Sequence, residues 1–542
     1  MSENINVTAP PDTNEKRGRA LVRHGSTLSL LTLISRVLGL AREMTKAALL
    51  GTSALSDAFS VAFMIPNLFR RLFAEGSIAV AFIPTFKEYL VDAETGKNSK
   101  ESIKEFLSCF ITFLSFFVTL TVMAGIVICP LIIRFFGMEE FNETVFLTRL
   151  MFPFLAFISI AAFFQGILNS LRIFAPSGFA PIVLNVITII CAYALSPYTK
   201  NPARAMAIGI LIGGFMEAAI QLPFVLRHKS NIRFFFTGLK KAVNNPGTRK
   251  VLRLVGPTII GMAAYQLNDL VSTALAGNAG EGIVSSLQYS LRLQELILGV
   301  FAVSIGTVLL PDLAEHAKSG QWEIYNQRLS SAVNIIALIT IPITFFSLAQ
   351  GQHLIRLLFQ TRSFNEESVR LTMAAFSFHM PGLFFIALNR ILAPAFYAQS
   401  DTKSPTLAGI ISFVVNMLLA FILAFRFKGA GIAFALTIAS AVNTVLLIVF
   451  LKKNPAITLS RTLKTSIAYT AKLILLSGIA VVPVIFLSPF LSALFAGRGR
   501  IVSQGAPLFI TALVYAAAGI ILLAATRDKQ FFAIVKMIRR RK

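Results

Sequence analysis

Long apolar runs, each about the length of a membrane-spanning helix, follow one another along almost the whole chain. A helix needs about 20 apolar residues to cross a bilayer, whereas a transmembrane strand needs about 10 residues of alternating polarity. Runs such as IIALITIPITFFSLA, at residues 335–349, do not alternate. Charged residues make up only 14% of the chain, where soluble domains carry about 25%. The sequence therefore predicts an all-α integral membrane protein.

The runs predict about fourteen transmembrane helices. Several runs exceed 25 residues, so we expect these helices to tilt or to project beyond the bilayer. The expected spans are residues 26–50, 57–89, 106–136, 144–171, 179–195, 204–226, 251–276, 283–311, 332–358, 371–397, 406–425, 432–451, 465–487 and 506–525.

The distribution of basic residues predicts the orientation of these spans. Lysine and arginine gather in the N-terminal tail, in alternate loops and at the C-terminus, which all lie on one side if fourteen spans alternate. The opposite loops near Gly51, Gly137 and Gly277 are short and poorer in bases. Because cytoplasmic loops carry the excess of lysine and arginine, we expect both termini in the cytoplasm.

Four pairs of similar segments occur in the same order in the two halves of the chain. FIPTFKEYL at Phe82 returns as LLPDLAEHA at Leu309, and ETVFLT at Glu143 returns as ESVRLT at Glu367. CPLIIRFFG and the surroundings of Pro181 have counterparts at QHLIRLLFQ and around Pro405. Six spans repeated in the same orientation predict two lobes, with a ligand site at their interface near the bilayer midplane.

This repeat divides the chain into five parts. The linker HKSNIRFFFTGLKKAVNN mixes apolar and basic residues, which favours an amphipathic helix on the membrane surface. The parts are a cytoplasmic basic tail at 1–25, a first lobe at 26–227, a cytoplasmic amphipathic linker at 228–250, a second lobe at 251–452, and spans thirteen and fourteen with a basic cytoplasmic C-terminus at 453–542.

Arginines lie inside spans, where a charge costs about 2.5–3.5 kcal/mol at the centre of an inserted helix. Arg36, Arg42, Arg70 and Arg292 come from three helices that the repeat puts beside the lobe interface. Arginine binds phosphate and carboxylate groups through two parallel hydrogen bonds and stays charged at ordinary pH. These residues favour an anionic ligand, although Arg292 and Glu295 are also spaced for a local ion pair.

A second polar group lies in the later spans. Asn268 and Asp269 fall inside the seventh span and Asn416 inside the eleventh. Their oxygen atoms favour either a small sodium site or a proton carrier. The alternative is structural, with Asp269 as a buried hydrogen-bonded carboxylate and Asn416 joining two helices.

The net charge of +25 does not indicate nucleic-acid binding, because the bases gather in loops and at the chain ends, where they meet anionic lipid. The three cysteines are scattered at Cys109, Cys129 and Cys191, without the spacing of metal ligands or of a disulfide framework. We therefore expect membrane lipids as neighbours and no nucleic acid, metal or cofactor.

The segments SRVLGLAREMTKAALLG and DAFSVAFMIPNLFRRLFAEGSIAVAFIPTFKEY resemble the start of the MurJ/MviN lipid II flippases, which belong to the multidrug/oligosaccharidyl-lipid/polysaccharide exporter superfamily. SLRLQELILGVFAVSIGTVLLP is similar to that family's eighth span. The resemblance covers essentially the whole chain. It implies two six-helix lobes that open alternately to either side, with the lipid tail held beside spans thirteen and fourteen.

The resemblance implies a substrate and its site. Lipid II is an undecaprenyl diphosphate that carries the disaccharide-pentapeptide precursor of peptidoglycan. By the family motif, Arg36, Arg42, Arg70 and Arg292 match cavity arginines, and Asp57 matches an acidic residue at the start of the second span. The implied setting is the bacterial inner membrane and cell-wall biogenesis, with a monomer that associates with the cell-wall synthesis machinery.

Two alternatives remain, together with the question of what drives transport. A related exporter of the same fold would carry drugs or another lipid-linked oligosaccharide, although cationic drugs favour carboxylates in the cavity. A membrane glycosyltransferase would need an acidic base or a metal and usually a large loop outside the membrane. We expect a transporter rather than an enzyme, driven by the membrane potential or by a sodium or proton gradient.

Overall fold

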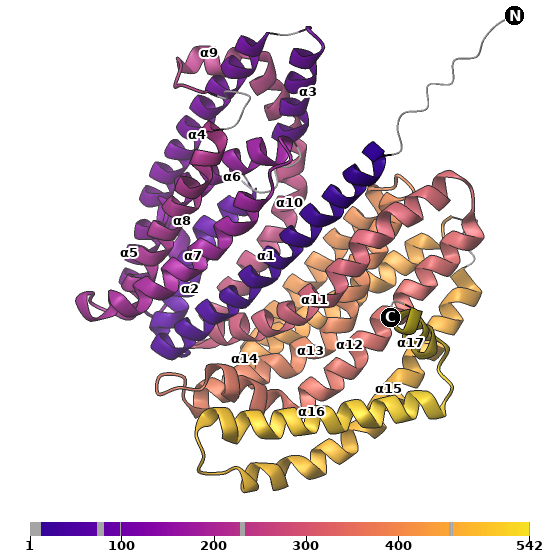
Figure 1. Cartoon of the computed structure of the whole chain (residues 1–542). Coiled ribbons are helices and arrows are strands. Elements are labelled where there is room, and N and C mark those ends of the chain that lie inside the picture. The colour runs from indigo at the N-terminus through magenta and orange to yellow at the C-terminus, as the bar shows by residue number, and fades with distance from the viewer. Residues whose placement is uncertain are drawn as a thin grey trace, which may run out of the picture. The chain divides into compact units, whose positions relative to one another are not determined.

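The computed structural model describes residues 12–72, 81–97, 99–227, 233–454, 457 and 459–540, and these residues are helical almost throughout (Figure 1). This confirms the all-α prediction. Nine helices in this described part are long and apolar enough to cross a membrane. The expected total of fourteen spans remains a prediction, because length and hydropathy identify only these nine among the described residues.

The first helices belong to the stretch with the intramembrane charges. They are α1 (Asp12–Leu50), α2 (Ala54–Phe69) and α3 (Ile83–Glu94). A π-helical turn at residues 70–72 follows α2. The described part of the expected span at 57–89 comprises most of α2, π-helical residues at 70–72 and 81–82, and the first part of α3, and residues 73–80, including Glu75, lie outside the description.

The middle and later helices follow the predicted apolar runs in most cases. They are α4 (Lys100–Phe135), α5 (Phe141–Met151), α6 (Phe154–Ser170), α7 (Ala175–Ala194), α8 (Pro202–Leu226), α9 (Leu239–Asn244), α10 (Pro246–Asn278), α11 (Ile283–Lys318), α12 (Trp322–Phe359), α13 (Glu366–Tyr397), α14 (Lys403–Leu451), α15 (Leu459–Leu494), α16 (Arg500–Ala525) and α17 (Lys529–Arg540), with a short 3₁₀ turn at Ser196–Tyr198. The helices α9 and α17 match none of the predicted runs, and the expected span at 144–171 is divided between α5 and α6.

The helix α14 contains two predicted spans in one continuous element. Its length of 49 residues exceeds any single crossing, and at Lys428 the backbone leaves the helical region with φ 49° and ψ −131°. This break falls between the apolar runs at 406–425 and 432–451. The two runs are therefore two helical halves joined at a kink.

The linker between the expected lobes is not one amphipathic helix. Residues 233–238 are non-helical, and only the six residues of α9 form a helix before α10 begins. The backbone N–H groups of Phe235 and Thr237 donate to the hydroxyls of Ser108 and Thr112 on α4, both at 3.0 Å. These side-chain acceptors satisfy backbone donors that a helix would otherwise have paired. Residues 228–232 lie outside the description.

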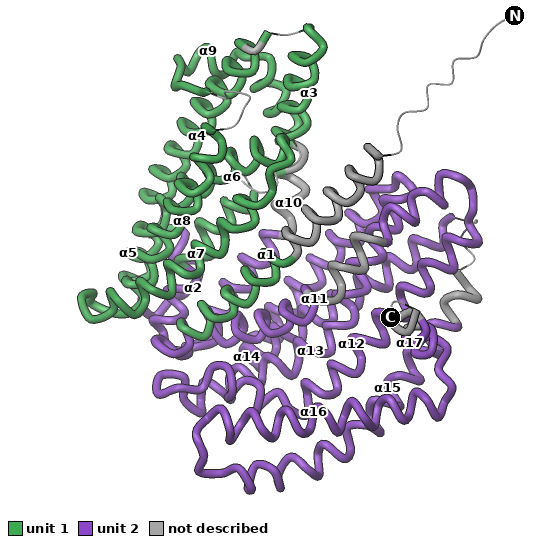
Figure 2. Tube along the Cα trace, in the orientation of Figure 1, with its two compact units in different colours: residues 1–45, 62–131, 142–263 green, residues 46–61, 132–141, 264–542 purple. Residues whose placement is uncertain are grey.

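The chain divides into two compact units, shown in different colours in Figure 2. Unit 1 comprises residues 1–45, 62–131 and 142–263, and unit 2 comprises residues 46–61, 132–141 and 264–542. The end of α1 and the first half of α2 therefore belong to unit 2, together with α11 to α17. This division decides which of the candidate residues the structure brings together.

Unit 1 is built on aromatic packing and close helix contacts. The ring of Phe82 lies 4.8 Å from that of Phe110 and 5.4 Å from that of Phe163, measured between centroids. Glycines let α8 approach α7, since a Cβ added at Gly209 would lie 2.8 Å from Cys191 Cβ. Small residues at such contacts are typical of membrane helices.

In unit 2, α15 and α16 pack against α12 (Figure 1). The Leu473 side chain of α15 is buried with Ala337 and Ile341 of α12, and Tyr515 of α16 donates to the carbonyl of Pro342 at 3.0 Å. These last two spans thus attach to the second half of the chain.

Candidate functional site

The carboxylate of Asp57, near the start of α2, is bound to the start of α11. One oxygen accepts from the Gly282 amide at 2.7 Å, and the other accepts from the amide and hydroxyl of Ser285 at 2.8 and 2.5 Å. Gly282 precedes the helix with φ 77°, a conformation that favours glycine, and supplies no side-chain cap. Asp57 is only 4% exposed. Asp57 therefore caps the N-terminus of α11 from another helix, and negative charge is favoured at a helix N-terminus.

A second carboxylate caps in the opposite direction. Glu281, just before α11, accepts from the amide of Ala54, the first residue of α2, at 2.8 Å. Each of the two helices thus has N-terminal N–H groups paired by a carboxylate from the other segment. We call this set, Ala54, Asp57, Glu281, Gly282 and Ser285, the α2–α11 latch.

Other contacts hold the turn between α1 and α2 against the same helices. The Tyr289 hydroxyl of α11 donates to the carbonyl of Gly51 at 3.0 Å. The hydroxyls of Thr52 and Ser368 lie 2.8 Å apart, which attaches the turn to α13. Unit 2 therefore holds this turn from two of its helices.

Lys46, in the last turns of α1, is a buried cation with polar partners. Its ammonium donates to the Ser60 hydroxyl at 2.8 Å and to Gln288 Oε1 at 3.1 Å, and it lies 4.6 Å from the centroid of the Tyr289 ring. Only 3% of the residue is exposed. These contacts replace water around the charge, so Lys46 has a structural role in unit 2.

Three of the predicted arginines belong to unit 1. Arg36 and Arg42 lie on α1, and both are partly buried. The Arg42 guanidinium lies 5.4 Å from the Phe63 ring centroid and 3.2 Å from Glu43 Oε1. Arg70, in the π-helical turn after α2, donates through Nε to Asn67 Oδ1 at 2.7 Å. Because these three arginines are only partly buried, their guanidinium groups remain accessible to a ligand.

The fourth arginine, Arg292, belongs to unit 2 and forms the local pair that its spacing predicts. Its Nη1 lies 3.5 Å from Glu295 Oε2 on the same face of α11. With side chains 31% and 57% exposed, this pair contributes little stability and leaves the guanidinium accessible. That the four arginines line a single cavity stays a prediction, because they are divided between the units.

The predicted oxygen-rich group is partly assembled in unit 2. The Asn416 amide of α14 donates to Asn268 Oδ1 at 2.7 Å and to the Ser272 hydroxyl at 3.2 Å, both on α10. Asn416 is buried, and its Oδ1 has no hydrogen-bond partner among the described residues. Asp269, the next residue after Asn268, is partly buried. Asn416 thus joins two helices, as its structural interpretation predicts, while retaining an acceptor.

The sequence did not predict the roles of Glu281, Gly282, Ser285 and Gln288, of which Gly282 and Ser285 bind Asp57, Gln288 binds Lys46 and Glu281 binds Ala54. The loop GNAGEG carried a local signal, since glycine is among the residues favoured at the N-cap and Gly282 directly precedes an apolar run. Its pairing with α2 had no signal, because Ser285 lies 228 residues from Asp57.

Comparisons with known proteins give one consistent result. The model of the family described as lipid II flippase MurJ matches residues 46–498. A probable lipid II flippase MurJ of Treponema pallidum is 47% identical over 525 residues, which cover 97% of this chain and 99% of the relative. A lipid II flippase MurJ of Burkholderia cenocepacia is 30% identical over 434 residues, which cover 79% of this chain and 83% of the relative.

Solved structures show the same similarity. A lipid II flippase MurJ in an inward closed conformation superposes with a TM-score of 0.74 at 25% identity, covering 92% of this chain and 99% of that one. An inward-facing transporter of the multidrug resistance MATE family has a TM-score of 0.62 at 14% identity. The latter likeness concerns the fold alone.

Proposed function

The chain belongs to the lipid II flippase MurJ family, and on that premise we propose that it carries lipid II from the inner to the outer leaflet of the bacterial inner membrane. Transport proceeds by alternating access, in which the path opens to one side at a time. The observation that carries the proposal is the set of partly buried arginines, Arg36, Arg42, Arg70 and Arg292, on apolar helices.

These arginines supply what the polar part of lipid II needs. The substrate presents a diphosphate and peptide carboxylates, which planar guanidinium groups bind through paired hydrogen bonds. The undecaprenyl tail stays in the lipid beside the helices, where it meets no desolvation cost. We propose that Arg42 binds the diphosphate directly, because its side chain remains 16% exposed and rests on the Phe63 ring.

We assign Asp57 a positioning role rather than direct contact with substrate. Both of its oxygens are used by the start of α11, and an anionic headgroup would be repelled by its charge. In the proposed topology, with both termini in the cytoplasm, the α2–α11 latch lies on the outer side. All five latch residues belong to unit 2, so the latch fixes the starts of α2 and α11 against each other within that unit.

We propose that the membrane potential drives the outward movement of the lipid II headgroup, and that a sodium or proton gradient is a second source of energy. Moving negative charge outward across a potential that is negative inside gains about 2.3 kcal/mol per charge per 100 mV. Asn416 Oδ1, which has no hydrogen-bond partner in the described part of the chain, supports a site for sodium or a proton together with Asn268 and Asp269 on the facing helix α10. We propose that the chain works as a monomer near the cell-wall synthesis machinery.

A leaflet-specific assay of lipid II tests the function. The host flippase of a tractable bacterium is depleted while this chain, or its Arg42→Ala variant, is expressed. Lipid II should accumulate in the inner leaflet within a generation without the chain, and the intact chain should restore outward delivery. Arg42→Ala should not, whereas Arg426→Ala, at the kink of α14, should behave as the intact chain does.

Two results would contradict the proposal. Normal growth on Arg42→Ala alone would show that the arginine is dispensable. If the well-expressed intact chain leaves lipid II delivery as low as in depleted cells without the chain, the fold would still hold, but the substrate would be another lipid-linked oligosaccharide. Equal expression of the variants, measured in isolated membranes, is the control for both arms.

A further inference from the structure

The ammonium of Lys46 lies in a small enclosure between α2 and α11. The Ser60 hydroxyl of α2 accepts from it at 2.8 Å, and Gln288 Oε1 of α11 accepts from it at 3.1 Å. The Tyr289 ring covers a third side, with its centroid 4.6 Å from the nitrogen. Water is largely shut out, since Lys46 is only 3% exposed. We call Ser60, Gln288 and Tyr289 the ammonium cage.

The cage presents acceptors to the lysine because donors of its own are used elsewhere. The Ser60 hydroxyl donates to the carbonyl of Ser56 at 2.7 Å, so its oxygen accepts from Lys46. The Tyr289 hydroxyl donates to the carbonyl of Gly51 at 3.0 Å, which holds the ring beside the ammonium. A ring face attracts a cation. The enclosure is therefore arranged for a positively charged group that carries N–H donors.

These groups select a primary ammonium among organic cations. A primary ammonium carries three N–H donors, which suit the two oxygens and the ring face of the cage. A quaternary ammonium has no donor, so it would leave the oxygens of Ser60 and Gln288 without the hydrogen bonds that they accept here. Leaving a buried acceptor unpaired costs free energy.

The buried carboxylate of Asp57 lies about one helical turn from the cage. Ser60 follows Asp57 by three residues on α2, and Gln288 follows Ser285, which binds Asp57, by three residues on α11. Residues three apart share a helix face and are separated by about 4.5 Å along the axis. The two helices therefore hold a buried cation and a buried anion near each other. Opposite charges attract more strongly in such an enclosed setting than in water.

We propose that the ammonium cage is a binding site for a primary ammonium, that Lys46 is its built-in occupant, and that the charge held there compensates Asp57. A buried charge is stable only when it is hydrogen-bonded and paired with an opposite charge. Lys46 takes the place of a dissolved cation, so the packing of α1 and α2 on α11 needs none. This inference concerns unit 2 alone and is independent of the flippase proposal.

Chemical rescue of Lys46→Ala by n-propylammonium tests the site. This amine supplies the methylene groups and the nitrogen that alanine lacks. The full-length protein in detergent is melted with n-propylammonium chloride, tetramethylammonium chloride or 1-propanol at equal concentration. We expect Lys46→Ala to lower the melting temperature by several degrees and only n-propylammonium to recover most of that loss. The intact chain should show no such preference, because its cage is already filled.

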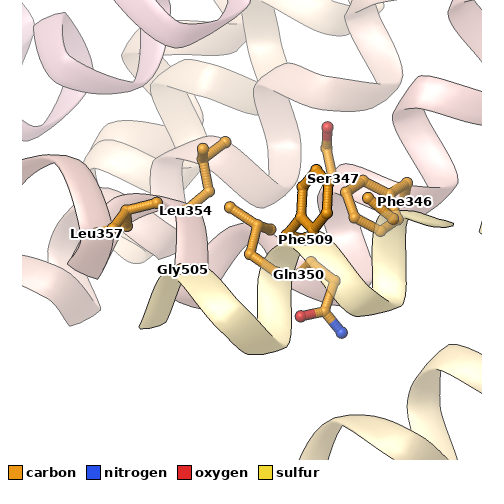
Figure 3. Close-up of a pocket in the computed structure, with 9 residues that line it drawn as sticks. Phe346, Ser347, Gln350, Leu354, Leu357, Gly505 and Phe509 are labelled. Atoms are coloured by element: carbon orange, nitrogen blue, oxygen red, sulfur yellow. The ribbon is translucent and has the colours of Figure 1, made fainter. Parts of the chain in front are cut away.

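Two further variants are the controls for the rescue. Lys46→Met fills the cage with an apolar side chain of similar length, so n-propylammonium should not recover its loss. The amine also fits the pocket of about 440 Å³ between α12 and α16, which is lined mainly by apolar side chains (Figure 3). Ala512→Phe fills that pocket. Adding Ala512→Phe to Lys46→Ala should therefore leave the recovery unchanged.

A double-mutant cycle tests the link to Asp57. Lys46→Met and Asp57→Asn each leave one buried charge uncompensated, whereas the double variant leaves neither. The loss in melting temperature of the double variant should therefore be smaller than the sum of the two single losses. Lys46→Met and Ser285→Ala should give the plain sum, because Ser285→Ala changes no charge.

Three results would overturn the proposal. The ammonium site is wrong if Lys46→Ala melts as the intact chain does, or if tetramethylammonium recovers its loss as well as n-propylammonium does. The counter-charge is wrong if the losses of Lys46→Met and Asp57→Asn add up. If Lys46→Ala does not accumulate in membranes, its combination with Asp57→Asn should accumulate, and equal absence of both would contradict the proposal. All these measurements are made without lipid II, so a failed transport assay does not affect them.

Discussion

The Asp57 carboxylate accepts hydrogen bonds from both the amide and the hydroxyl of Ser285, so that one helix supplies the N-terminal cap of another. Capping groups normally come from the residue just before the helix. Here Gly282 holds that position and provides only the left-handed turn. The stability of the start of α11 therefore depends on the position of α2.

The latch predicts energetic coupling between its two residues. Asp57→Asn and Ser285→Ala should each destabilise the protein, and their combined effect should fall short of the sum by about 1–3 kcal/mol. The measurement is a double-mutant cycle on unfolding in detergent. Asp401, which caps α14 through the amides of Lys403 and Ser404, gives the control. The changes in unfolding free energy caused by Asp401→Asn and Ser285→Ala should add up, because the two residues do not interact. If the changes for Asp57→Asn and Ser285→Ala also add up, Asp57 does not cap α11 through Ser285.

Two glycines with positive φ predict different tolerance to alanine. Gly51 and Gly96 have φ of +59° and +75°, so alanine is strained at both by about 1 kcal/mol. At Gly51 an added Cβ would also lie 2.1 Å from the carbonyl oxygen of Ser363, whereas at Gly96 it meets open space. Gly51→Ala should lower the melting temperature far more than Gly96→Ala. Equal shifts would show that the turn relaxes freely.

The Glu143–Arg204 pair of unit 1 should contribute more stability than an exposed pair. Arg204 reaches both carboxylate oxygens, at 2.6 and 2.7 Å, and its guanidinium lies 3.9 Å from the Phe146 ring centroid. Arg204→Lys keeps the charge but loses this geometry, so we expect a loss of about 1.5–3 kcal/mol. Arg370→Lys, in the exposed pair with Glu367, should cost under about 1 kcal/mol. Chemical denaturation of both variants measures the difference.

Asp528, between α16 and α17, predicts a stability change at acid pH. Burial raises the pKa of its carboxyl, but hydrogen bonds from Lys472 and the Phe531 amide outweigh burial and hold the pKa below its ordinary value. Because this pKa is lower in the folded state, the ionised carboxylate stabilises the protein. The stabilisation is complete above the unfolded-state pKa of about 3.9 and is lost as the pH falls through the folded-state pKa. The intact chain should therefore lose its advantage in melting temperature over Asp528→Asn below about pH 4. A constant difference down to pH 2 would contradict this linkage.

Ion coupling predicts a sodium or proton dependence that the polar group near Asn416 controls. Removing sodium, or collapsing the proton gradient, should slow lipid II delivery in the intact chain. Asp269→Asn and Asn416→Ala should abolish that dependence, because they remove ligand oxygens from the group. The readout is the leaflet assay in cells with defined gradients. Transport that is independent of both ions, and equal in Asp269→Asn, would leave the membrane potential as the driving force.

Much of the fold could be predicted because it depends on local properties. Apolar length predicted the helices, and the break at Lys428 falls between two predicted runs. The Arg292–Glu295 pair follows from helix periodicity. The linker was mistaken for one amphipathic helix because its composition fits that pattern, whereas hydroxyls on α4 take up its backbone donors at Phe235 and Thr237.

The sequence by itself determined that the chain is an all-α membrane protein, and its motifs indicated the lipid II flippase family, because spans and motifs are contiguous runs of residues. Only the tertiary structure decided what the buried charges do. It paired Asp57 with α11 and Lys46 with Gln288, which lies 242 residues away. Such pairs depend on how distant helices meet, and no periodicity within either helix specifies the other partner.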